Sequence, residues 1–116
     1  MKILIAEDCK EIRDIQELYL SELCQIDFAE NGQIGYEKAK LGKYDLIITD
    51  VNMPVMGGIE MIEKLRDEKV TTPIFVFSGE IGIKSILEMS KVRHHIEKNM
   101  DELLDLVKEF KNEKAS

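Results

Sequence analysis

The sequence lacks any long hydrophobic run. None of its apolar stretches approaches the ~20 residues that a helix needs to cross a bilayer. The first apolar stretch, residues 1–6, is cut off by Glu7 and Asp8, far short of the core of a signal peptide. We therefore expect a cytoplasmic protein that does not bind a membrane.

Cysteine is scarce as well. Cys9 and Cys24 are too few for the disulfide framework of a small secreted protein. Two carboxylates stand directly before Cys9 and oppose formation of its thiolate, so a nucleophilic role is not expected there. Both side chains are predicted to be reduced thiols, with Cys24 in the hydrophobic core.

Positive charge is in deficit, with 16 Lys and Arg against 23 Asp and Glu and a net charge of −7. An acidic surface repels nucleic-acid phosphates, so we expect no direct nucleic-acid binding. Linkers, repeats and low-complexity tracts are also missing. The 116 residues, 44% of them hydrophobic, suffice for one folded core, and we expect a single domain over residues 1–116.

Short apolar segments alternate with longer segments of helical spacing. Continuous apolar runs at residues 3–6, 46–48 and 74–77 are typical of strands buried on both faces of a parallel sheet. Weaker strands are predicted at 26–29 and 93–97. These segments are the candidates for five strands.

The segments between the strands carry apolar residues at helical spacing. The predicted buried stripes are Ile12, Ile15, Tyr19 and Leu23, then Ile59, Ile62 and Leu65, and finally Met100, Leu103, Leu104 and Val107. A weaker helix is expected at 34–41 and a short fourth helix around Ile83, Ile86 and Leu87. Five strand–helix repeats predict an α/β fold, a doubly wound five-stranded parallel sheet between two layers of helices.

Polar side chains follow the strands where their carboxyl ends should meet. They are Glu7, Asp8, Asp50, Ser78 and Lys98. In such sheets the functional crevice lies at this edge. Three carboxylates repel one another unless a cation binds among them, and hard oxygen ligands favour Mg²⁺. One carboxylate could then attack phosphorus, with the hydroxyl and the ammonium near the phosphoryl oxygens.

Several motifs stand out along the chain: the Ile-Leu-Ile-Ala-Glu-Asp of residues 3–8, Asn31-Gly32, the stretch 44–58 with Met-Pro and Met-Gly-Gly after Asp50, residues 73–79, and Lys98. Together they resemble one known family, the receiver domain of two-component response regulators. The resemblance implies a flavodoxin-like, CheY-like fold. It also implies a phosphorylation-activated switch that receives its phosphoryl group from a histidine kinase or a phosphotransfer protein and acts on a downstream protein or output domain.

The resemblance also assigns roles to residues. Asp50 would be phosphorylated, and Mg²⁺ would be bound by Asp8, Asp50 and the backbone carbonyl of Asn52, with Glu7 assisting through water. Ser78 would be the switch hydroxyl and Lys98 would contact the phosphoryl group.

Three further positions follow from the family pattern. Asn52 and Glu80 fall where such domains tune the lifetime of the phosphoryl group. His95 falls where an aromatic switch residue is usual. It would either switch between buried and exposed states or simply pack as a strand residue.

The segment before the last helix departs from the family pattern. Family members usually have proline directly after the active-site lysine, joined by a cis bond, whereas this chain has Asn99. A cis bond before a non-proline residue costs ~3 kcal/mol. Either Lys98–Asn99 is cis under strain, or it is trans and Lys98 approaches the site differently. Asn99 is also a candidate N-cap of the last helix.

Two other functions compete with the switch. One is a receiver-like interaction domain that signals without phosphorylation. The other is a Mg²⁺-dependent phosphohydrolase with Asp50 as its nucleophile. Such enzymes usually need a second acid two residues later, where this chain has Asn52. We therefore do not expect an enzyme, beyond catalysis of the domain's own phosphorylation and dephosphorylation.

Overall fold

A computed structural model describes residues 1–80 and 82–115. Strands and helices alternate along the chain as predicted. In order they are β1 (Lys2–Ala6), α1 (Lys10–Leu20), β2 (Gln25–Ala29), α2 (Gly32–Ala39), β3 (Leu46–Thr49), α3 (Gly58–Asp67), β4 (Ile74–Phe77), α4 (Lys84–Met89), β5 (His94–Ile96) and α5 (Met100–Ala115).

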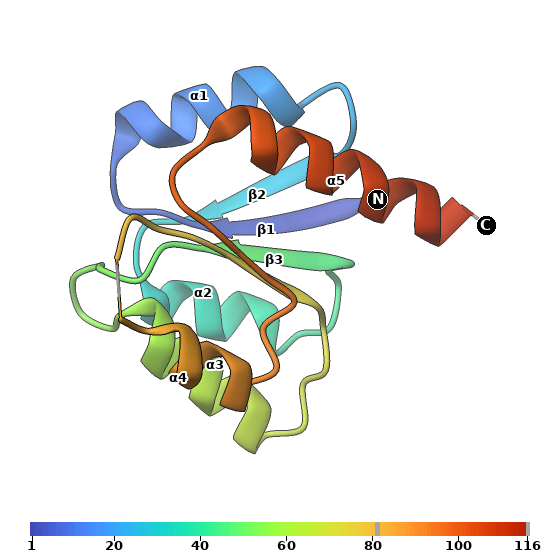
Figure 1. Cartoon of the computed structure of the whole chain (residues 1–116). Helices are drawn as coiled ribbons and strands as arrows, with labels where there is room; N and C mark the ends of the chain where they lie inside the picture. Colours follow the sequence, from blue (N-terminus) through green and yellow to red (C-terminus); the bar gives the residue numbers. More distant parts are fainter. Residues whose placement is uncertain (81, 116) are drawn as a thin grey trace.

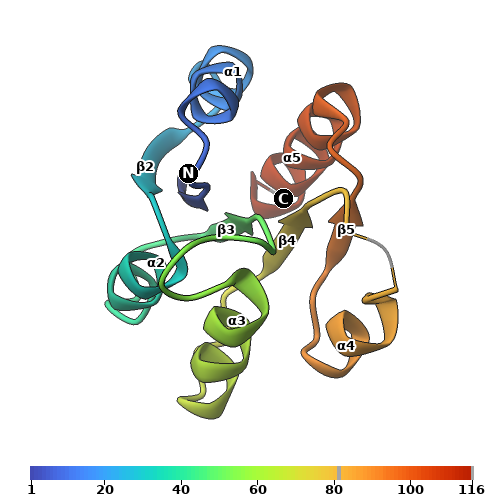
Figure 2. The same cartoon turned by 90° about the vertical axis from the view of Figure 1, so that its left-hand side faces the viewer.

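The five strands form one parallel sheet in the order β2-β1-β3-β4-β5. Helices α1 and α5 cover one face, and α2, α3 and α4 cover the other (Figure 1; Figure 2). The predicted doubly wound architecture is confirmed. The chain reverses its winding direction at β1 and β3, and in sheets of this kind the functional crevice lies at the carboxyl ends of the two strands where this happens.

The core has two halves, one on each face of the sheet. Leu4 and Ile47 point toward α2, α3 and α4, and Met61 of α3 packs with them. The neighbouring Ile5 and Ile48 point to the opposite face and pack near α1 and α5. This alternation arises because successive strand residues face opposite sides. It explains why the strands read as continuous apolar runs.

The buried face of α1 differs from the predicted one. Ile15 and Tyr19 are 44% and 38% exposed, while Gln16 and Leu20 are buried. The inward line runs through residues 12, 16 and 20, one position away from the predicted stripe. Both rows of residues have helical spacing. Because the buried row contains the polar Gln16, its hydrophobicity is lower than that of the exposed row with Ile15 and Tyr19. The prediction for Ile15 and Tyr19 was wrong for that reason.

Two other helices also deviate in detail. Helix α2 begins at Gly32, earlier than predicted, because the Asn31 side chain accepts a hydrogen bond from Ile34 N at 2.9 Å and caps the helix. Helix α4 is short, as predicted. Ile83 and Leu87 are buried near it, but Ile86 is 42% exposed and does not belong to the buried stripe.

Both cysteines are free and half-buried, and Cys24 packs against the core beneath α1 and α5. Among the described residues, no helix is long and apolar enough to cross a membrane.

Candidate functional site

The carboxyl ends of the strands form one edge because the backbone ladder continues one residue past them. Asp50 N donates to Ala6 O at 3.0 Å, and Ser78 N donates to Ile96 O at 2.9 Å. The residues that follow β1, β3, β4 and β5 are thereby held in adjacent rows. Regular strand pairing thus positions the candidate site.

Three carboxylates meet at this edge. One oxygen each from Glu7, Asp8 and Asp50 lie within 4.8 Å of one another. Their exposure differs: Glu7 is 1% exposed, the Asp50 side chain is 12% exposed, and Asp8 is open to solvent. The cluster is therefore closed underneath by Glu7 and accessible from the side of Asp8.

Lys98 bridges two of these carboxylates. Its Nζ lies 3.2 Å from Glu7 Oε1 and 3.1 Å from Asp50 Oδ2. The other oxygens accept from the backbone, Glu7 Oε2 from Cys9 N at 3.3 Å and Asp50 Oδ1 from Val51 N at 2.7 Å. These contacts fix the orientation of both carboxylates.

One ammonium does not balance this much negative charge. Burial, and next the charge of Asp50, raise the pKa of Glu7 to about 7, although Lys98 and the Cys9 N–H act in the other direction. Burial alone would lower the pKa of Lys98, but hydrogen bonds and charges from Asp50 and Glu7 raise it. A divalent cation with hard oxygen ligands would relieve the remaining repulsion.

Lys98 reaches the carboxylates through its own backbone conformation. The Lys98–Asn99 peptide bond is trans, and Lys98 has a left-handed φ of 53°. Asn99 Oδ1 accepts a hydrogen bond from Glu102 N at 3.0 Å and so caps α5. Of the two alternatives drawn from the sequence, the trans one is therefore present, and the lysine still points inward.

Ser78 and its neighbours form a second group at the same edge. Ser78 is 2% exposed, and its Oγ accepts from Glu80 N at 3.1 Å. The Glu80 side chain in turn accepts from Asn52 Nδ2 at 2.6 Å, so the two candidate tuning residues contact each other across the crevice. His95 is half-buried, with Nε2 3.1 Å from the carbonyl oxygen of Ser78.

Sequence reasoning assigned no supporting role to three residues, although Thr49 and Gly58 belong to the 44–58 stretch that it singled out. Arg13 of α1 donates to the carbonyl oxygen of Glu7 at 2.8 Å, and the buried Thr49 hydroxyl donates to that of Asp50 at 2.8 Å. A Cβ at Gly58 would lie 2.0 Å from Asp50 O, so this position requires glycine. A hydroxyl within an apolar run was the available signal for Thr49. Nothing in the spacing pointed to Arg13.

The fold and the site define a class of protein, an α/β domain with a lysine-bridged carboxylate cluster at the topological switch point of its sheet. The family model of the response regulator receiver domain matches residues 3–111. The chain belongs to this family, whose members are signalling domains.

Known relatives agree with this assignment. The cell cycle response regulator CtrA of Brucella ovis is 40% identical over 85 residues, which cover 72% of this chain and 37% of CtrA. The chain thus matches little more than a third of that relative's length. The response regulator TrrA of Thermotoga maritima, solved in complex with Mg²⁺-BeF, superposes with a TM-score of 0.83 at 32% identity, covering 94% of this chain and 97% of TrrA. The chemotaxis protein CheY4 of Vibrio cholerae gives a TM-score of 0.83 at 28% identity, with the same coverage of 94% and 97%.

Proposed function

We propose that this domain is a phosphorylation-activated switch in which Asp50 accepts a phosphoryl group from a histidine kinase or a histidine phosphotransfer protein. The observation that carries the proposal is the Lys98 bridge between Glu7 and Asp50, because it joins a candidate nucleophile, an acidic cluster and a cation in one crevice. Strand ends are often polar for solubility alone, but solubility does not require a lysine that bridges two carboxylates.

Hard oxygen donors at this edge fit Mg²⁺. The carboxylates of Asp8 and Asp50 and the backbone carbonyl of Asn52 would hold the ion, with Glu7 assisting through water. Cys9 is the nearest thiol in sequence, and it makes its hydrogen bond to Glu11, so soft ligands do not compete in this cluster. When bound, Mg²⁺ would neutralise the carboxylates and the phosphoryl oxygens.

In the transfer step, a carboxylate oxygen of Asp50 forms a bond to phosphorus while the bond between phosphorus and the donor's imidazole nitrogen breaks. The imidazole leaves with the electron pair of that bond, and Asp50 becomes an acyl phosphate. The ammonium of Lys98, now 3.1 Å from Asp50 Oδ2, would donate to a phosphoryl oxygen.

Ser78 and His95 would transmit the change. In the structure the Ser78 hydroxyl bonds the backbone of Glu80, and a phosphoryl group offers it a stronger, charged acceptor. Movement of Ser78 would alter the 79–99 segment. His95 belongs to this segment and contacts the carbonyl oxygen of Ser78 through Nε2, so it would respond to the movement. The face near α4 and β5 would then present a changed surface to the downstream partner.

Asn52 and Glu80 would set how long the phosphoryl group lasts. Their hydrogen bond spans the crevice, where it would position or obstruct an attacking water. We assign both residues to tuning, not to the transfer step.

Intact-mass measurement with Mg²⁺ and acetyl phosphate tests the proposal. The wild-type chain should gain one phosphoryl group that is lost in base, and Asp50→Asn, which keeps the size but removes the nucleophile, should gain none. Ser78→Ala is the matched control, because it removes a hydroxyl at the same edge and should still be labelled. Continued labelling of Asp50→Asn, or labelling that only Ser78→Ala abolishes, would refute the assignment.

A further inference from the structure

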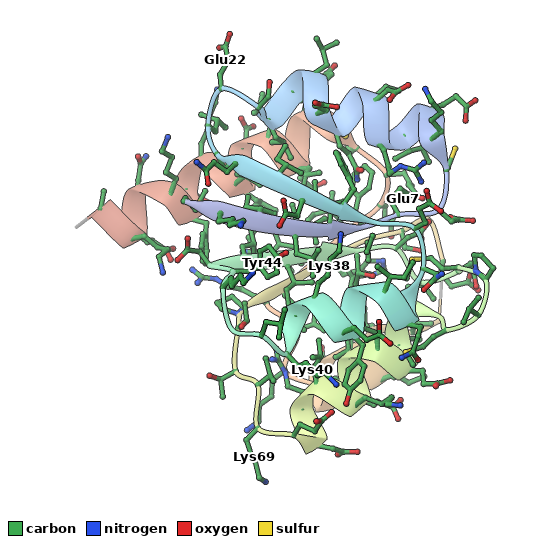
Figure 3. The ribbon with its side chains drawn as sticks, turned by 180° about the vertical axis from the view of Figure 1, so that it is seen from behind. Glu7, Glu22, Lys38, Lys40, Tyr44 and Lys69 are labelled. Atoms are coloured by element: carbon green, nitrogen blue, oxygen red, sulfur yellow. The ribbon has the colours of Figure 1, made fainter. Side chains whose placement is uncertain are left out.

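A second cavity lies at the opposite end of the sheet, at the amino ends of β4 and β5. Its volume is about 450 Å³. Four cationic side chains line it, together with the apolar Val70 and Pro73; the cations are Arg66, Lys69, Lys91 and Arg93. Figure 3 shows Lys69 well away from Glu7, at the lower edge of the view. In a protein of net charge −7, such a concentration of positive charge calls for an explanation.

Arg66 forms the floor of this cavity. Its guanidinium donates to the carbonyl oxygens of Val70 at 2.8 Å, Thr72 at 3.0 Å and Ser90 at 3.0 Å. These carbonyls follow the ends of α3 and α4, so Arg66 fastens the two loops together. Its positive charge has only neutral acceptors within the described part of the chain.

Lysine occupies the same unusual position after both helices. Val70 N bonds Leu65 O at 2.9 Å and Val92 N bonds Leu87 O at 3.1 Å, the pattern of a Schellman helix end. The left-handed residue of that motif is usually glycine. Here it is a lysine both times, with φ of 64° at residue 69 and 58° at residue 91. A lysine one turn earlier would interact favourably with the helix dipole without adopting a left-handed backbone conformation.

Among the described residues, no carboxylate forms an ion pair with Lys69 or Lys91. Arg93 pairs with Glu113, and Glu63 and Asp67 line a neighbouring groove that shares Arg66 and Ser90 with the cavity. The cavity therefore offers two exposed ammonium groups beside an apolar wall.

We propose that this cavity binds a small organic phosphate of the size of a nucleoside monophosphate. The phosphate would lie between Lys69 and Lys91, and the apolar part of the molecule would lie against Val70 and Pro73. An ammonium is a suitable point-charge partner for phosphate, and the volume is that of a small-molecule site. This site is independent of the phosphorylation proposed for Asp50.

An NMR titration with adenosine monophosphate tests the proposal. It is done at constant ionic strength and without Mg²⁺, so that the carboxylate cluster does not take part. Amide signals of residues 66–72 and 90–93 should shift and saturate. The double variant Lys69→Gln, Lys91→Gln should bind at least about tenfold more weakly, since the two charged contacts together contribute about 1.4 kcal/mol or more, about tenfold in affinity.

The control variant is Lys40→Gln, Lys43→Gln, which removes the same charge elsewhere and should bind as the wild type does. Three results would overturn the proposal. One is no saturable shift at millimolar nucleotide. Another is equal weakening in both double variants. The third is that inorganic phosphate, or a peptide rich in aspartate, binds as tightly as the nucleotide, which would indicate a general anion surface or a protein-docking surface.

Discussion

Asp8 is the solvent-exposed member of the carboxylate cluster, so its charge adds to the repulsion there and would contribute to the proposed Mg²⁺ site. Asp8→Asn should weaken Mg²⁺ binding by at least about tenfold, a loss seen even when residues behind the ligands are changed. In the absence of Mg²⁺ the same variant should be slightly more stable than the wild type, because one like charge is gone. Isothermal titration and urea denaturation measure the two effects.

Asp14→Asn is the matched control for that experiment. Asp14 is also an exposed aspartate, but it pairs with Lys10 on the surface of α1. Its variant should bind Mg²⁺ as the wild type does. Unchanged Mg²⁺ affinity in Asp8→Asn would contradict the proposed metal site.

Val55 holds a conformation that β-branched residues rarely adopt. Its φ is 68°, and its side chain is 82% exposed, so little burial compensates for the strain. Val55→Gly should raise the free energy of unfolding by about 1 kcal/mol, because relief of left-handed strain exceeds the entropy cost of glycine. Urea denaturation with Mg²⁺ absent measures the change.

Thr71→Gly provides the comparison for Val55→Gly. Thr71 is likewise exposed and β-branched, but its φ is not positive. Glycine there should destabilise the fold, because only the entropy cost remains. Destabilisation of similar size in both variants would show that Val55 stores no strain.

At the scale of single residues, the sequence predicted which side chains gather at the carboxyl edge but not how they are held. Glu7, Asp50 and Ser78 follow directly from the strand ends. The position of Lys98 relative to Glu7 and Asp50 could not be predicted from the strand ends, because it depends on a left-handed backbone conformation at a residue that is not glycine. The contact between Asn52 and Glu80 joins two loops whose conformations have no periodic signal.

Among the elements, α1 carries an inward-facing polar residue. Gln16 is 1% exposed, and its Oε1 has no hydrogen-bond partner among the described residues. Gln16→Met keeps the length of the side chain and removes the buried polar atoms. It should therefore raise the free energy of unfolding by about 1 kcal/mol, which chemical denaturation would measure.

Gln25→Met is the corresponding control, since Gln25 is exposed on β2 and its replacement should change stability little. Loss of stability in Gln16→Met would mean that the amide of Gln16 is satisfied in solution, and that α1 packs against the core through a polar contact.

The same residue explains why element prediction succeeded for strands and failed for this helix face. A strand buried on both sides needs only a continuous apolar run, so β1, β3 and β4 were predictable to within one residue. A helix face must be chosen among neighbouring lines of residues. Exposed Ile15 and Tyr19 compete with buried Gln16 in α1, and hydrophobicity favours the wrong line.

For the whole molecule, Asp45 ties the two ends of the chain together. Its carboxylate accepts from Lys2 N at 2.9 Å and pairs with Lys114 Nζ at 3.1 Å. The Lys2 N–H, and next Lys114, lower the pKa of Asp45 below its ordinary value of 3.8. An acid with a lowered folded-state pKa stabilises the fold above its unfolded pKa and loses this effect as pH falls through the folded value.

Asp45→Asn should therefore lower the free energy of unfolding at pH 6 by about 1 kcal/mol. As pH falls below 3.8 the difference from the wild type should shrink, and it is lost once pH has fallen through the lowered folded-state pKa of Asp45. Urea denaturation of both proteins at pH 6 and at successively lower pH measures this difference in the free energy of unfolding. Asp105→Asn, which changes an exposed aspartate, is the control for this substitution. A constant difference for Asp45→Asn at all pH values would contradict the predicted loss of stabilisation in acid.

The overall arrangement was predictable because parallel strands bring their carboxyl ends to one edge whatever the loops do. The cavity at the other end was not, because Arg66 comes from the last turn of α3 while Lys69, Lys91 and Arg93 come from two loops, with no common sequence pattern.

The carboxylate cluster at one end of the sheet and the cationic cavity at the other contribute an electric dipole moment directed along the strands. Glu7, Asp8 and Asp50 lie at one end, and the Arg66 cavity lies at the other. The electric field of an approaching charged partner would rotate the domain into a preferred orientation before the two make contact. Because added salt screens this torque over about 10 Å at 0.1 M, the rate of encounter with a basic phosphodonor should fall as ionic strength rises.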